Sequence, residues 1–73
     1  MTTPTMSSAQ KKLSTKNLQA LEDQLNHESL LVHKYQHASD TCSDPQLRQL
    51  CGNIAVKHQS HFDTLLNYLN SHQ

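Results

Sequence analysis

Apolar side chains recur at alternating spacings of three and four along two stretches of this chain. In the first stretch, from about residue 15 to 41, the repeating positions are Leu18, Leu21, Leu25, Glu28, Val32, Tyr35, Ser39 and Cys42. Residues three and four apart share one face of an α-helix, so this spacing predicts a helix with a heptad-like seam. Glu22, Asp23 and Lys34 fall between the seam positions and predict a solvated opposite face.

The second stretch follows a break at residues 42–44 and has the same period. Asp44 followed by Pro45 is typical of a helix N-cap with proline at the first helical position. The helix is predicted to run from Pro45 to about residue 70, with its seam at Leu47, Cys51, Ile54, His58, His61, Leu65 and Tyr68. Further apolar residues lie beside this seam and make the face wider than one partner helix needs: Ala55, Phe62, Leu66 and Leu69. Gly52 is predicted to point away from the seam.

The short break between the two stretches predicts that the helices are antiparallel neighbours. We therefore expect an all-α fold, an antiparallel two-helix hairpin over residues 14–73, with Ser14 or Thr15 as the first N-cap. The surplus apolar surface predicts a second copy of the hairpin, so that a homodimer forms a four-helix bundle. Residues 1–13 are rich in Thr, Ser and Lys and are predicted to form a disordered tail.

Composition excludes several classes of function. The six Lys and Arg residues balance the six Asp and Glu residues and form no basic run, which argues against nucleic acid as a partner. No apolar run approaches the ~20 residues of a membrane span, and the first residues lack the apolar region of a secretory signal. We therefore expect a protein of the cytoplasm or of an assembly. No nucleophile–base motif or phosphate-binding loop indicates an enzyme.

The cysteines Cys42 and Cys51 are too few for a disulfide framework, and in the hairpin they lie too far apart along the helix axis for an intrachain bond. Buried free thiols are the expected state. A crosslink between chains in an assembly stays open.

Three polar groups lie on the seams where apolar residues are expected. Folding about the turn places Glu28 opposite residue 59, between His58 and His61. A lone carboxylate in an apolar seam costs several kcal/mol unless it is neutralised, paired or ligated. One interpretation is a Glu28–histidine ionic layer that sets register and dimer partner. Another is a site for a divalent metal such as Fe, Mn or Zn, with Glu28, His58 and His61 as ligands.

A third interpretation is pH-responsive assembly, in which protonated histidines beside Glu28 favour the folded state at low pH and this support fades as pH rises. Tyr35 is either a core aromatic or a hydrogen-bond donor to the Glu28 layer. His33 and His37, four residues apart, could chelate a surface ion, although such pairs are usually solvated.

The segment Asp44-Pro-Gln-Leu-Arg-Gln-Leu50, followed by the histidine-containing helix, resembles the short ferritin-like proteins of the spore coat F type, over roughly residues 18–70. In ferritin-like bundles two helices each supply a Glu and the other two each supply Glu-x-x-His. This chain has Glu28 and then His58-Gln-Ser-His61, so His58 replaces the second Glu.

The resemblance implies a spore-associated structural or assembly protein without established catalysis, with other coat proteins as possible partners. Its alternative implication is a metal-binding module whose site is completed by homodimerisation. In that module, each chain would supply Glu28, His58 and His61.

Overall fold

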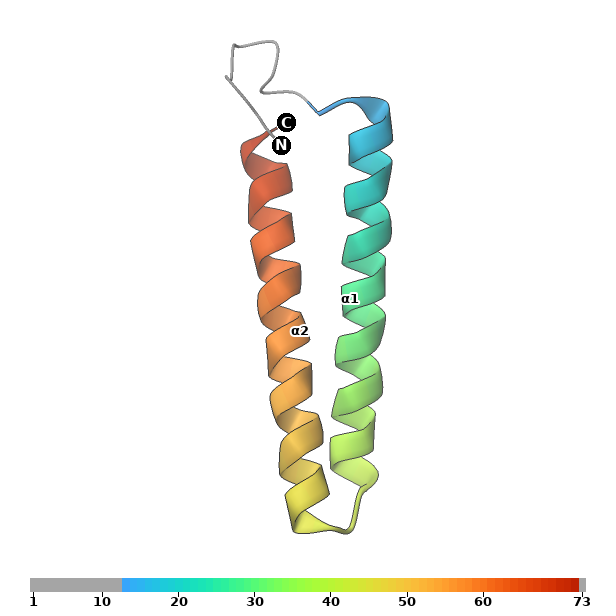
Figure 1. The fold of residues 1–73 in the computed structure, drawn as a ribbon, viewed down its shortest axis with the longest axis vertical. Helices are drawn as coiled ribbons and strands as arrows, with labels where there is room; N and C mark the ends of the chain where they lie inside the picture. Colours follow the sequence, from blue (N-terminus) through green and yellow to red (C-terminus); the bar gives the residue numbers. More distant parts are fainter. Residues whose placement is uncertain (1–12, 73) are drawn as a thin grey trace.

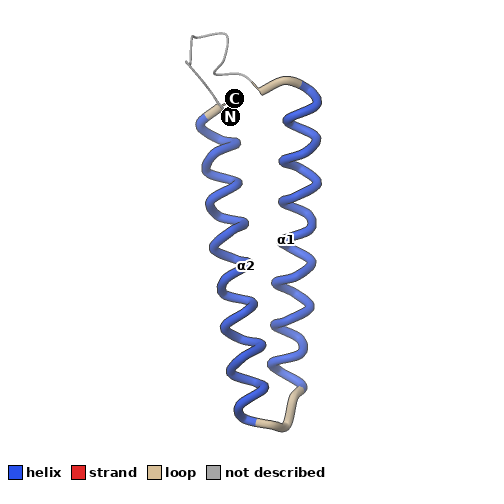
Figure 2. The backbone as a smooth tube through the Cα atoms, in the orientation of Figure 1, coloured by secondary structure: helices blue, strands red, loops and turns tan. Residues whose placement is uncertain are grey.

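Two long α-helices run antiparallel beside one another in the computed structural model, which describes residues 13–72 (Figure 1). Helix α1 spans Thr15–Thr41 and helix α2 spans Pro45–Ser71, and a short loop joins them (Figure 2). The predicted all-α antiparallel hairpin is confirmed. The predicted disordered tail, residues 1–13, lies outside the described residues except for Leu13. Neither described helix is both long and apolar enough to span a membrane.

Both helices begin at side-chain caps. The Ser14 hydroxyl accepts a hydrogen bond from the backbone N–H of Asn17 at 3.1 Å. The Asp44 carboxylate accepts one from the backbone N–H of Gln46 at 2.9 Å, and Pro45 occupies the first turn. These bonds satisfy N–H groups that have no partner inside the helix. The N-cap predicted at Asp44 is therefore confirmed, and of the two residues predicted for the first cap, Ser14 or Thr15, Ser14 is the cap and Thr15 begins the helix.

The turn is closed by hydrogen bonds between the start of α2 and the end of α1. The Arg48 guanidinium donates to the Cys42 carbonyl through Nε at 3.1 Å and Nη2 at 2.9 Å. The Ser39 hydroxyl donates to the Arg48 carbonyl at 2.9 Å. Since these bonds join both helices within one turn of the loop, they fix the register at this end of the hairpin.

The core between the helices is thin. Among residues 13–72, the buried hydrophobic residues are Leu25, Cys51 and Ala55, of which only Ala55, at 2% exposure, is almost fully enclosed. Cys51 is a free thiol, as is the partly buried Cys42. A hairpin of this size with so little enclosed apolar surface has small intrinsic stability.

Gly52 lies against α1, which contradicts the expectation that it points away from the other helix. A Cβ atom added at Gly52 would lie 3.4 Å from the Ser39 hydroxyl oxygen. A side chain larger than a methyl group at this position would displace Ser39, which is buried and donates to the Arg48 carbonyl.

Candidate functional site

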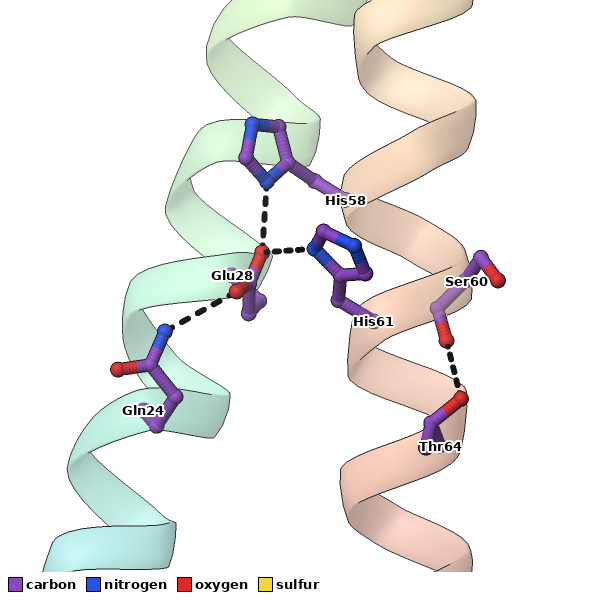
Figure 3. Close-up of polar contacts among 6 residues, drawn as sticks. All are labelled: Gln24, Glu28, His58, Ser60, His61 and Thr64. Atoms are coloured by element: carbon purple, nitrogen blue, oxygen red, sulfur yellow. Dashed lines mark hydrogen bonds and ion pairs between the residues drawn. The ribbon is translucent and has the colours of Figure 1, made fainter.

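A buried carboxylate near the middle of α1 faces two histidines of α2 (Figure 3). Glu28 has 7% of its surface exposed and is the one charged residue among the buried described residues. His58 and His61 are three apart in α2, so their side chains leave the helix on neighbouring sides. The structure thus brings together all three residues that the sequence singled out, from two helices of one chain.

One carboxylate oxygen contacts both rings. Glu28 Oε1 lies 2.7 Å from His58 Nδ1 and 3.7 Å from His61 Nδ1. The side chain of His58 is 22% exposed and that of His61 is 53% exposed. Solvent exposure therefore increases across the site from the carboxylate to His58 and then to His61, and the open side of the site lies at His61.

The second carboxylate oxygen is held by Gln24, whose side-chain amide donates to Glu28 Oε2 at 3.0 Å. The spacing pattern does not predict this role, because Gln24 lies between the seam positions Leu21 and Leu25, where a solvated side chain is expected. The signal that could have found it is the spacing of four, at which glutamine and an acidic residue can hydrogen-bond along a helix. Gln24 orients the carboxylate so that Oε1 is left for the histidines.

These contacts lower the pKa of Glu28 from its ordinary value of 4.5. The hydrogen bond with His58 has the largest effect, and burial opposes it by raising the pKa. The hydrogen bond from Gln24 and the positive charges that His58 and His61 carry when protonated lower the pKa further. Hydrogen bonding to the charged form outweighs burial, so the carboxylate stays ionised near neutral pH.

Aromatic contacts fix the ring of His58. Tyr35 stacks on it with ring centroids 6.1 Å apart and planes inclined by 16°, and His61 meets it edge-on at 5.8 Å. No hydrogen bond links Tyr35 to Glu28 among the described residues, so Tyr35 orients the site by packing rather than by donating to it. His33 and His37 are exposed and belong to no group of three or more possible metal ligands in residues 13–72.

The arrangement is suited to two kinds of chemistry. His58 Nδ1–H donates to Glu28 both as imidazolium and as the neutral Nδ1–H tautomer, so the pair can form with or without a charge on the ring. Alternatively, the carboxylate and one ring nitrogen of each histidine can face one cation, because one ligand atom from each residue lies within 4.8 Å of the others. A pairing layer and a metal site thus use the same atoms.

The sequence matches no protein-family model, and neither curated proteins nor solved structures yield a match. The resemblance to the spore coat F type therefore gives no family assignment. The antiparallel two-helix hairpin is the part of that expectation that the structure confirms.

Proposed function

We propose that this chain is a non-enzymatic assembly protein, in which two hairpins dock into a four-helix bundle. The observation that supports this function is an exposed apolar stripe on α2. Leu47, Leu50 and Tyr68 are 47%, 54% and 42% exposed. Together with the partly buried Ile54 and Leu65 they recur at helical spacing along one flank of α2.

The stripe continues onto α1 through Tyr35. This ring stacks on His58 and is only partly buried, and Leu31 and Ala38 lie one turn to either side of it on the same flank of α1. Soluble proteins seldom leave an extended apolar surface without a partner. Fully burying a leucine side chain contributes about 1.5–3 kcal/mol. Leu50 is 54% exposed, so docking would add a part of this to a hairpin with three buried hydrophobic residues among residues 13–72.

A second copy fits this surface better than a charged partner. The chain has formal net charge zero, so two copies do not repel one another through their overall charge. The stripe follows the spacing of a coiled-coil seam, which packs against another seam of the same period. The stripe is interrupted by His61, which belongs to the polar layer formed with Glu28 and His58. Docking in another register would place these polar groups against apolar side chains, and this cost favours a single register.

The biological setting is a separate proposal. Association with a spore coat, and with other coat proteins as partners, is supported by the resemblance of the sequence around Asp44–Leu50. It stays a prediction, as does the cytoplasmic or coat location.

The oligomeric state of the full chain tests the assembly function. We expect light scattering on a sizing column to give the mass of a dimer for the wild type and a shift to monomer for Leu50→Glu. Val56→Glu is the matched control, because Val56 is 69% exposed but lies off the stripe, and it should remain dimeric. A wild type that is monomeric throughout the concentration range, or variants that dissociate equally, would contradict the proposal.

A further inference from the structure

We propose that Glu28, His58 and His61 of a single chain bind one divalent transition-metal ion of the Zn²⁺ type. One carboxylate and two imidazoles are a donor set that such ions take in proteins. All three donors converge within one hairpin, with ligand atoms no more than 4.8 Å apart. The site therefore needs no residue from a second copy and does not rest on the proposed assembly.

The distances between donor atoms are close to those of a coordination sphere. Ligands of tetrahedral zinc, each about 2.0–2.1 Å from the ion, lie about 3.3 Å from one another. The two Nδ1 atoms lie 2.7 and 3.7 Å from Glu28 Oε1, on either side of that value. The donor atoms of the three residues lie within 4.8 Å of one another, so side-chain shifts of up to about 1.5 Å convert the hydrogen-bonded layer into a metal site. The ion takes the place of the proton that His58 shares with Glu28.

The surroundings of the donors favour a cation. Glu28 supplies a negative charge in a buried position, and Gln24 holds its other oxygen at 3.0 Å as an outer partner that orients the ligand. Tyr35 stacks on the ring of His58 with ring centroids 6.1 Å apart. These groups preorganise two of the three ligands before an ion arrives.

The third ligand, His61, lies on the side from which an ion can enter the site. In a single hairpin His61 has 53% of its side chain exposed, so an ion can reach the carboxylate from solvent on this side before a second copy covers the stripe. Three protein ligands leave the fourth position of a tetrahedral ion open to water. Metal binding displaces protons from the imidazoles, and we therefore expect the affinity to fall as the solution becomes more acidic.

Titration of the untagged, reduced full chain with Zn²⁺ against a chromophoric chelator tests this site, with native mass spectrometry giving the stoichiometry. We expect one ion per chain. His61→Ala and Glu28→Gln should each weaken the affinity by about 100-fold or more, since loss even of an outer partner of a ligand costs 10–100-fold. The double variant His33→Ala/His37→Ala and the variant Cys42→Ser keep the proposed ligands and should bind like the wild type.

Circular dichroism of each variant verifies that the helices persist, and ring-nitrogen NMR supplies a readout that folding alone does not change. Zn²⁺ should shift the Nδ1 signals of His58 and His61 in wild-type protein. One ion per two chains would show a site shared between copies, and equal loss of affinity in the His33/His37 control would show surface chelation. Either result, or absence of stoichiometric binding, overturns the single-chain site.

Discussion

Glu28 Oε1 and His58 Nδ1 lie 2.7 Å apart although the two residues are thirty positions apart in the chain and on different helices. This contact joins the middle of α1 to the middle of α2, far from the loop that connects them. Because Glu28 is buried, its charge depends on this partner and on Gln24 for compensation. The pair therefore couples the stability of the hairpin to the protonation of one carboxyl group.

We predict that the contribution of Glu28 to the stability of the hairpin depends on pH. The pKa of Glu28 is lower in the folded chain than its ordinary value of 4.5, chiefly because His58 hydrogen-bonds the ionised form. A group with a lowered pKa contributes stability that is complete above its unfolded value and disappears as pH falls through the folded value. We expect the Glu28 contribution to be present above pH 4.5 and to be lost below it.

Urea unfolding of wild type and Glu28→Gln, in metal-free buffer at a series of pH values, measures this contribution. The difference in unfolding free energy between the two proteins should shrink as pH falls below 4.5. His33→Ala, on an exposed part of α1, should follow the wild-type curve across this range. A difference that does not change with pH would show that the carboxylate is not stabilised by its partners.

The second prediction concerns the closest packing between the helices. Ala55 is 2% exposed, so Ala55→Leu must force the helices apart or displace its neighbours. Overpacking of this kind costs about 1–3 kcal/mol. Val56→Leu is the matched control, since Val56 is 69% exposed and the change should lie within about 0.5 kcal/mol of zero. Chemical denaturation at one fixed protein concentration compares the two, and a stabilised Ala55→Leu would contradict the packing described.

The third prediction concerns Gly52. A glycine inside a helix costs about 1 kcal/mol relative to alanine. The added Cβ would lie 3.4 Å from the Ser39 hydroxyl oxygen, which is ordinary van der Waals contact. We therefore expect Gly52→Ala to raise the unfolding free energy by up to about 1 kcal/mol.

Gly52→Val is the contrasting variant, because its branches must displace Ser39 and weaken the hydrogen bond to Arg48, and thermal unfolding should show it to be less stable than Gly52→Ala. If alanine destabilises the chain as much as valine does, the approach of Ser39 requires glycine itself.

The hairpin could be predicted from the sequence because its signals are local. The cap residues Ser14 and Asp44, Pro45 and the three–four spacing of apolar positions each act within a few residues. The proximity of Glu28 to His58 and His61 could also be predicted from the sequence, because a short turn between two regular helices determines which positions face each other. These are properties of helix geometry and need no knowledge of side-chain packing.

Other features depend on the rotation of each helix about its axis. Residues three apart differ by about 60° in their direction around an α-helix. The spacing pattern in the sequence assigns both to the same seam and does not distinguish their directions. The structure separates His58, which is mostly covered, from His61, which is mostly open. The same rotation brings Gly52 against Ser39, and the position of Gln24 beside Glu28 depends on a side-chain rotamer.

The hydrogen bond from the Ser39 hydroxyl to the Arg48 carbonyl, beside the loop, bears on the order in which the hairpin folds. Their contact closes a segment of nine residues, whereas the contact of Glu28 with His58 closes one of thirty, and this difference costs about 1 kcal/mol more in chain entropy. We therefore expect the hairpin to form first at its loop, and the contact of Glu28 with His58 to form after the helices have aligned. Weakening that layer should hasten unfolding while leaving the rate of folding nearly unchanged.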